Sequence, residues 1–225
     1  MPSYIKPVMS ADEAVSMIPD GATVMVGGFN VGGVPYSLTE ALLRRGTKDL
    51  TLISNDTATE SRGHGKLVAS GQVKKVIASH IGLNRMTQRL YNEGKLEVEF
   101  VPQGTLAERI RAGGFGLGGI LTPTGVGTPV EEGKRVVEVN GRRYLLELPL
   151  RADFALIKAK KADRMGNLWY YGNARNFNPL MAAAADTVIA EVDEIVEVGE
   201  IDPNDVHTPG ILVDVLVLKE YDLPI

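Results

Sequence analysis

Short runs of apolar and β-branched residues alternate, through the first half of the chain, with segments whose apolar residues recur at helical spacing. The runs predict strands at residues 23–26, 50–54, 73–79 and 96–101. The segments between them predict helices at residues 36–45, 66–70 and 85–93. Strands that alternate with helices are typical of βαβ units, so the pattern predicts an α/β fold: an open, mostly parallel sheet with flanking helices.

Capping and turn residues predict where several of these elements begin and end. Ser10 followed by Glu13 predicts a capping box for a first helix, which we expect to end near residue 21. A glycine-rich turn at residues 27–33 follows the first of these strands. Pro35 suits the first position of the next helix, and Gly46 suits its end.

The second half of the chain has a different pattern. After a short predicted helix at residues 106–112, seven of the seventeen residues at 113–129 are glycine, and we expect an ordered loop there. Asn140-Gly141, between apolar runs at 136–139 and 142–148, predicts a hairpin that adds antiparallel strands to the parallel sheet. Further strands are predicted at 154–158, 187–192 and 211–218, with a helix at 180–185. Since no linker or repeat interrupts the chain, we expect residues 1–225 to form a single domain.

Composition narrows the class of protein. The chain is 44% hydrophobic and has no apolar run near the roughly 18 residues of a membrane helix, and its first residues lack a secretion signal, so we expect a cytoplasmic protein that does not span a membrane. A net charge of -4 with dispersed basic residues argues against binding to nucleic acid. The absence of cysteine excludes disulfides, thiolate metal sites and a cysteine nucleophile.

Candidate ligand-binding positions follow from the topology alone. Ligands of open α/β sheets bind beyond the carboxyl ends of the strands, where this sequence places Gly27 and Gly28, Asn55, His80 and Gln103. The glycines would let the backbone approach an anionic ligand at a helix start, although a tight turn requires glycine equally well. The two carboxamides could stabilise an oxyanion or orient a carboxylate at any pH, or cap a loop.

Other patterns give weaker signals. The glycines at 114, 116 and 119 have dinucleotide-binding spacing but follow a predicted helix instead of a strand, and residues 63–66 lack the rest of a P-loop. The histidines lack metal-ligand spacing, so we expect structural or solvent-exposed roles and no metal. A run of acidic residues is interpreted as a solvated face or strand edge without catalysis; its members are Glu191, Asp193, Glu194 and Glu197.

The sequence DGATVMVGGFNVGGVP at 20–35 resembles the first signature of the family I coenzyme A transferases. The resemblance continues through SND at 54–56, LEVEFVPQGTLAERIRAGG at 96–114, TPTGVGT at 122–128 and ARNFN at 174–178, and so covers nearly the whole chain. Within that family the chain resembles the A, or α, subunit.

The resemblance implies roles for specific residues. It assigns Gln103 to an oxyanion hole and Asn55 to the neighbourhood of a nucleophilic carboxylate. The nucleophile itself is a glutamate in a Ser-Glu-Asn-Gly motif of the B subunit, which this sequence lacks, so a partner chain is expected in an α2β2 assembly. Coenzyme A is then a substrate, with no cofactor or metal required. The residues assigned to coenzyme A binding are Gly27, Gly28, Phe29, Asn30, Val31, Gly32 and Gly33.

The implied activity is ping-pong transfer of coenzyme A between a short-chain acyl-CoA and a carboxylate of the acetate, butyrate or acetoacetate class. One alternative is the same chemistry on 3-oxoadipate or succinate, which an additional cation facing the acyl group would indicate. A different alternative is a non-catalytic module that senses acyl-CoA or sugar phosphate. The short segment before the first strand leaves no room for the helix-turn-helix that such regulators carry, and the negative charge opposes contact with DNA.

Overall fold

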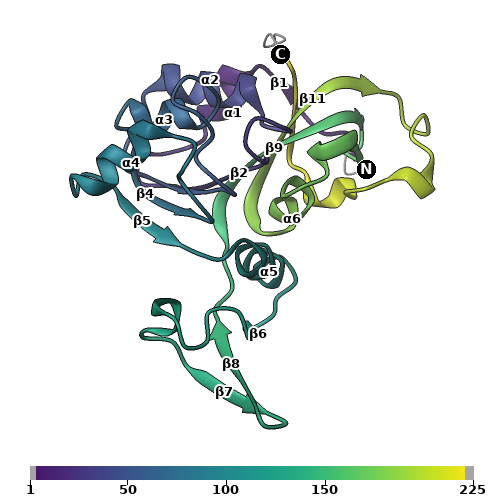
Figure 1. Ribbon diagram of the computed structural model, residues 1–225. Coiled ribbons are helices and arrows are strands. Elements are labelled where there is room, and N and C mark those ends of the chain that lie inside the picture. The colour runs from purple at the N-terminus through teal and green to yellow at the C-terminus, as the bar shows by residue number, and fades with distance from the viewer. Residues whose placement is uncertain (1–3, 221–225) are drawn as a thin grey trace.

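A large sheet of nine strands organises the chain. The computed structural model describes residues 4–220, and in it the strands follow the order β1-β12-β11-β9-β2-β3-β4-β5, with β10 paired to β9 (Figure 1). Every pair along this path is parallel, and only the short β10 runs antiparallel to its neighbour. The predicted α/β fold with an open, mostly parallel sheet is therefore confirmed. The strands are β1 Val8–Met9, β2 Thr23–Val26, β3 Leu50–Ile53, β4 Val73–Ala78, β5 Glu97–Phe100, β9 Ala152–Asp163, β10 Leu168–Trp169, β11 Ala185–Val196 and β12 Val215–Leu218.

The helices cover both faces of this sheet. The predicted capping box is confirmed, since Ser10 and Glu13 bond to each other's backbone N–H groups, but α1 ends at Val15, earlier than expected. Helix α2 has the predicted bounds, and Gly46 closes it in the left-handed conformation, with φ 74°. The helices are α1 Ala11–Val15, α2 Tyr36–Arg45, α3 Gly65–Ala69, α4 Arg85–Asn92, α5 Gln103–Gly114 and α6 Asn178–Ala183. No helix of the described residues is long and apolar enough to span a bilayer.

Two hydrophobic cores result because successive strand residues face opposite sides of a sheet. In β2, Val24 and Val26 belong to the core beneath α1, α2 and α3, whereas Met25 belongs to the core beneath α5 and α6. In β9, Leu156 and Ile157 divide in the same way. A strand buried on both faces is apolar throughout, which explains why these strands appear in the sequence as continuous apolar runs.

A second, antiparallel sheet of three strands projects from the body below α5 (Figure 1). It contains the predicted hairpin, β7 Val136–Val139 and β8 Arg142–Glu147, whose turn residues Asn140 and Gly141 both have positive φ. The expectation that this hairpin extends the parallel sheet is wrong. Its third strand is β6 Ile120–Thr122, which lies inside the stretch predicted to be loop. Three residues are too few to show alternation among so many glycines, so the local pattern carried no signal for it.

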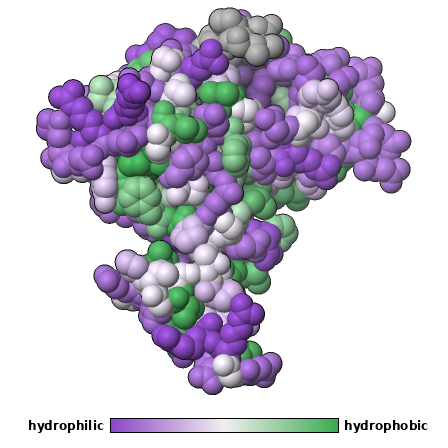
Figure 2. Space-filling model, in the orientation of Figure 1, coloured by the Kyte–Doolittle hydropathy of each residue, from purple (hydrophilic) through white to green (hydrophobic). Residues whose placement is uncertain are grey.

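The surface of the projecting sheet and of α5's end carries several exposed apolar side chains. Figure 2 shows hydrophobic patches on the projecting part and on the body above it, within a largely hydrophilic surface. The exposed large apolar residues of residues 115–148 are Phe115, Leu117, Leu121, Val139 and Leu148.

Candidate active site

Four neighbouring strands, β2 to β5, end at one edge of the sheet because they are mutually parallel. Gly27 follows β2 directly, Asn55 comes shortly after β3, His80 after β4 and Gln103 after β5. The residues that topology selected therefore follow strands that end along a common edge, where ligands of such folds bind.

Gln103 and Asn55 are in direct contact at this edge. The Nε2 group of Gln103 donates a hydrogen bond of 2.6 Å to Oδ1 of Asn55. Sequence reasoning placed Gln103 in a loop before a helix at 106–112, which is wrong: Gln103 is the first residue of α5. The longer helix fixes the backbone of Gln103 while its side chain stays exposed to solvent.

The orientation of both carboxamides follows from the hydrogen-bond chemistry of Asp56. Asn55 is fully buried, and its Nδ2 group donates to Oδ2 of Asp56 at 2.7 Å. A carboxylate only accepts, so Nδ2 must face Asp56 and Oδ1 must face Gln103. Gln103 is then held as a donor, and its primary amide retains a second N–H for a ligand oxygen.

Asp56 connects the Gln103–Asn55 pair to the glycine-rich turn at residues 27–33. The sequence analysis did not predict Asp56 as a site residue. Besides Asn55, it accepts from the backbone N–H of Asn30 at 2.7 Å, in the glycine-rich turn, and from that of Ala58, also at 2.7 Å. It is only 2% exposed. The available signal was the position of Asp56 just beyond the end of β3, where ligands bind in such folds. The sequence does not show that Asp56 bonds Asn30, which lies in a different turn.

Ser79 connects the end of β4 to the same cluster. Its Oγ donates to the backbone carbonyl of Asn55 at 2.7 Å and lies 3.1 Å from Nδ1 of His80. The structure therefore places His80 beside the Gln103–Asn55 pair through Ser79, as a neighbour of the cluster.

The turn at residues 27–33 folds back on itself. The backbone groups of Phe29 and Gly32 exchange two hydrogen bonds, of 2.9 and 3.0 Å, and Asn30 between them has φ 54°. Gly28 has φ 123°, and a Cβ there would come within 2.6 Å of Cγ2 of Val34. Gly28 is thus required by the turn's own conformation and packing.

Residues 173–178 pack against the same turn. They comprise Asn173 and the ARNFN stretch at 174–178. Nδ2 of Asn178 donates to the carbonyl of Gly33 at 3.0 Å, and Oδ1 of Asn178 accepts from the N–H of Lys158 at 2.9 Å. A Cβ at Gly27 would collide with Oδ1 of Asn178. The glycines therefore permit a close approach of the chain to itself, and their presence alone does not require a ligand.

The start of α2, just beyond this turn, is capped by a residue from a distant strand. Oε2 of Glu191, in β11, accepts from the N–H groups of Ser37 at 2.8 Å and Leu38 at 3.2 Å. Glu191 is 2% exposed, and Nζ of Lys158 lies 3.3 Å from its Oε1. Burial raises the pKa of the Glu191 carboxyl above its usual range, and Lys158 opposes that shift.

The acidic run is therefore not simply a solvated face. Glu191 is a buried helix cap, and Asp193 accepts from Lys158 at 2.5 Å and from Lys160 at 2.9 Å. Glu191 and Asp193, two positions apart, lie on one face of β11 and share Lys158. Glu194 lies on the other face and pairs with Lys161, and both lysines belong to β9.

The three histidines have separate surroundings. His64 is buried, its Nε2 bonds the carbonyl of Asp56 at 2.9 Å, and burial lowers its pKa. Nδ1 of His207 accepts from the N–H of Tyr170 at 2.9 Å. Among residues 4–220 no group of three or more acidic or histidine side chains is arranged to hold a metal ion.

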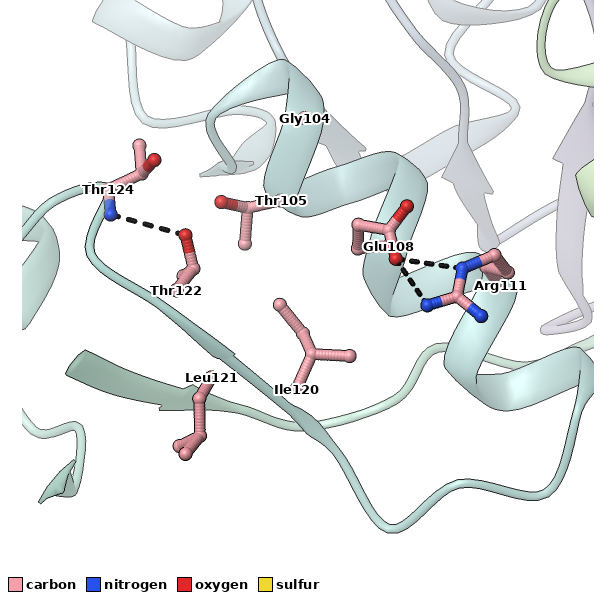
Figure 3. A pocket seen from close by; sticks show the side chains of 8 residues that line it. All are labelled: Gly104, Thr105, Glu108, Arg111, Ile120, Leu121, Thr122 and Thr124. Atoms are coloured by element: carbon pink, nitrogen blue, oxygen red, sulfur yellow. Dashed lines mark hydrogen bonds and ion pairs between the residues drawn. The ribbon is translucent and has the colours of Figure 1, made fainter. Parts of the chain in front are cut away.

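A cavity of about 520 Å³ lies between α5 and β6. The first residue that lines it is Gly104, which follows Gln103 in the sequence. Figure 3 shows threonine side chains on one side of it and aliphatic side chains from β6 below. Its single cation, among the side chains shown, is Arg111, whose Nε and terminal nitrogen bond Oε2 of Glu108 at 2.8 and 2.6 Å. The lining residues are Gly104, Thr105, Glu108, Arg111, Ile120, Leu121, Thr122 and Thr124.

Several coenzyme A transferase subunits are similar to this chain over nearly its whole length. The alpha subunit of the acetate CoA-transferase of Escherichia coli is 54% identical over 213 residues, covering 95% of this chain and 97% of that protein. The A subunit of the 3-oxoadipate CoA-transferase of Pseudomonas putida is 50% identical, covering 92% and 91%. The alpha subunit of the acetoacetyl-CoA:acetate/butyrate CoA transferase of Clostridium acetobutylicum is also 50% identical, covering 90% and 93%.

Solved structures agree with this similarity. An acyl-CoA transferase of Escherichia coli, in a thioester complex with coenzyme A, superposes with a TM-score of 0.87 at 27% identity over 98% of this chain. This chain spans 48% of that protein, or about half its length. The family profile described as coenzyme A transferase matches residues 8–219. The chain therefore belongs to the coenzyme A transferase family.

Proposed function

We propose that this chain is the A subunit of an enzyme that moves coenzyme A between a short-chain acyl-CoA and a carboxylate such as acetate, butyrate or acetoacetate. The observation that carries the proposal is the Gln103–Asn55 contact at the ligand-binding edge of the sheet. It presents an exposed, oriented amide donor at that edge. Relatives named as alpha subunits of acetate and of acetate/butyrate CoA-transferases support the same substrate class.

The proposed reaction begins on a glutamate of the partner chain. Its carboxylate attacks the thioester carbonyl, and the C–S bond breaks. The coenzyme A thiolate departs, and an acyl-glutamyl anhydride remains on the enzyme. The thiolate then attacks the glutamyl carbonyl, releasing the first carboxylate and forming a glutamyl-CoA thioester. The acceptor carboxylate reverses these two steps. The reaction uses no cofactor or metal.

Each attack passes through a tetrahedral oxyanion, and the proposed role of Gln103 is to stabilise it. Its second Nε2–H is free to donate, and the first, held by Asn55, prevents the amide from rotating. Donors fixed in advance stabilise the transition state more than the ground state because they need no reorganisation. Asn55 is therefore proposed as a positioning residue for Gln103, and the turn at 27–33 as part of the coenzyme A site.

A partner B chain is required by this mechanism. The names of the relatives as alpha or A subunits support such a partner, and the absence of a Ser-Glu-Asn-Gly motif from the sequence supports a division of the active site between chains. The exposed apolar residues of the projecting sheet offer a surface of the kind that a partner covers. An α2β2 assembly is proposed on the same basis.

The acyl cavity favours a monocarboxylic substrate over a dicarboxylic one. We assign the acyl group to the cavity between α5 and β6 because two of the residues that line it, Gly104 and Thr105, directly follow Gln103 in α5. A second carboxylate on 3-oxoadipate or succinate would need a free cation, whereas Arg111 is already paired with Glu108. Because one relative is named as a 3-oxoadipate CoA-transferase, the experiment below also includes dicarboxylic substrates.

The decisive experiment compares the chain alone with the chain co-expressed with its partner. Acyl exchange between acetyl-CoA and butyrate, acetoacetate, succinate or 3-oxoadipate is measured for both preparations. We expect activity only in the complex, and highest with the monocarboxylates. Robust turnover by the isolated chain would overturn the division of the active site, and preference for succinate or 3-oxoadipate would overturn the substrate class.

A further inference from the structure

His80 belongs to a series of hydrogen bonds that leads to Gln103. Nδ1 of His80 lies 3.1 Å from Oγ of Ser79, just beyond the end of β4. Oγ of Ser79 lies 2.7 Å from the backbone carbonyl of Asn55, and Oδ1 of Asn55 accepts from Nε2 of Gln103 at 2.6 Å. The series therefore connects three of the positions that follow strands at the ligand-binding edge of the sheet.

The donor of each bond follows from the number of protons available. The Ser79 hydroxyl carries one proton, and a carbonyl oxygen only accepts, so the 2.7 Å separation from the Asn55 carbonyl requires that proton. Ser79 then has no proton for His80, and Nδ1 of His80 must be the donor. The opposite tautomer of His80 would draw the Ser79 proton towards Nδ1 and away from Asn55.

Ser79 holds the main chain of Asn55, while Asp56 holds its side chain. The backbone N–H of Ser79 donates to the same Asn55 carbonyl at 2.9 Å, in addition to the bond from Oγ. Nδ2 of Asn55 donates to Oδ2 of Asp56 at 2.7 Å. Asn55 is fully buried, so these bonds at both ends of the residue fix the position of Oδ1, the acceptor for Gln103.

We propose that His80 is a positioning residue for Gln103, which its Nδ1–H orients through the Ser79 hydroxyl and Asn55. His80 and Ser79 donate in the same direction, so the first bond polarises the Ser79 hydroxyl and strengthens its bond to Asn55. The proposal rests on the proposed function, because it concerns the rate of the reaction assigned to Gln103. The competing explanation is contact between substrate and Nε2 of His80, which bonds no residue among 4–220.

Two substitutions of His80 separate the roles of its ring nitrogens. The amide of His80→Asn can donate from the position of Nδ1, whereas the amide of His80→Gln reaches the position of Nε2. Single-turnover formation of the enzyme–CoA thioester is measured on the two-chain complex over a range of acetoacetyl-CoA concentrations. We expect His80→Gln and Ser79→Ala to lower the saturated rate about 3- to 10-fold, with the half-saturating concentration unchanged within about twofold. His80→Asn should keep the saturated rate within about twofold of the wild type.

Ser70→Ala is the matched control for Ser79→Ala. The Ser70 hydroxyl lies 3.0 Å from the carbonyl of Leu67, at the end of α3 and before β4 begins, so it belongs to the opposite edge of the sheet. Its loss should leave both the saturated rate and the half-saturating concentration unchanged. A rate for Ser79→Ala equal to that of Ser70→Ala would show that the Ser79 hydroxyl has no part in positioning and would overturn the proposal.

Double variants show whether the effect passes through Gln103. Ser79→Ala and His80→Gln should cause no further slowing in a chain that already carries Gln103→Ala, because the group that they position is gone. The same slowing with and without Gln103, or a normal rate for His80→Gln together with a slow His80→Asn, would overturn the proposal. A normal rate for Gln103→Ala alone would refute the role of Gln103 itself. That failure of the proposed function is distinct from failure of the proposal for His80, in which Gln103→Ala is slow and the His80 and Ser79 variants are not.

Discussion

Gln103 and Asn55, separated by 48 positions in the sequence, share a hydrogen bond of 2.6 Å in which Gln103 is the donor. Asp56 determines the direction of this bond. Its carboxylate accepts from the Nδ2 group of Asn55, which leaves Oδ1 of Asn55 to accept from Gln103. The exposed amide is thus ordered by a buried carboxylate that it does not touch. Such an arrangement separates the group proposed to meet the substrate from the group that orients it.

Replacing Gln103 should affect rate far more than stability. Gln103→Ala removes an exposed side chain, so the melting temperature should hardly change, whereas formation of the enzyme–CoA thioester should slow by about 100- to 1,000-fold. Gln103→Glu should be slower still, because a carboxylate repels both the developing oxyanion and Oδ1 of Asn55. Single-turnover rates on the two-chain complex check this order. Equal rates for wild type and Gln103→Ala would remove Gln103 from the reaction.

Asp56→Asn should destabilise the fold and loosen the turn. The new amide presents N–H groups where Asp56 accepts three bonds, at a cost of about 1–3 kcal/mol in the free energy of unfolding. The matched control is Asp12→Asn, which disrupts an exposed pair with Arg44 and should cost less than about 0.5 kcal/mol. Urea denaturation measures both variants. Equal losses would show that Asp56 contributes no more than a surface carboxylate.

Gly27→Ala tests the packing of the turn against Asn178. The added methyl group would displace Oδ1 of Asn178, which accepts from the N–H of Lys158, and overpacking of this kind costs about 1–3 kcal/mol. Gly82→Ala is the control, because a Cβ there meets nothing within 4 Å. Thermal unfolding of both variants should show a lower midpoint only for Gly27→Ala. If Gly27→Ala is as stable as the control, the contact with Asn178 is adjustable.

Glu191→Ala should be among the more damaging single changes in β11. It leaves two N–H groups of α2 unpaired and removes one carboxylate from Lys158, for an expected loss of about 2–3 kcal/mol. Glu194→Ala, on the same strand but in an exposed pair with Lys161, should lose less than about 1 kcal/mol. Chemical denaturation curves compare the two. A loss for Glu191→Ala no greater than that for Glu194→Ala would contradict its role as a helix cap.

The buried His64 predicts a loss of stability in mild acid. Its pKa is lowered by burial, so the unfolded chain binds a proton at higher pH than the folded chain does. The contribution is complete above the ordinary histidine pKa of about 6.5 and declines as pH falls below it, by up to about 1.4 kcal/mol per pH unit. His64→Gln should make stability decline less steeply between pH 7 and 5. The pKa of His207 is also lowered, but His207 contributes equally to the wild type and the variant. Parallel stability profiles would show that the pKa of His64 is not lowered in the folded chain.

The order of elements was predictable because local patterns and turn chemistry agreed in the first half of the chain. β2 and α2 have the predicted bounds since a glycine turn, Pro35 and Gly46 delimit them. The early start of α5 was missed because Pro102 precedes it and no capping side chain marks Gln103. That residues 1–225 form one domain stays a prediction.

The candidate site was predictable only as positions along an edge. Parallel strands bring Asn55 and Gln103 to one side of the sheet, which topology states in advance. The partners that orient them depend on approaches between turns distant in sequence, such as Asp56 to Asn30 and Glu191 to Ser37. No spacing rule records such pairs, so the acidic run containing Glu191 was misread from the sequence.

The anchors of the glycine-rich turn also bear on the order in which the chain can acquire its native form during synthesis. Gly33 is held by Asn178, 145 positions later, and Ser37 by Glu191, 154 positions later. A ribosome-bound chain that ends before α6 lacks both anchors, and closure of so long a loop comes at an entropic cost that local contacts do not repay. The sheet from β2 to β5 can therefore assemble early, while the turn that follows β2 becomes rigid only after the last quarter of the protein has emerged.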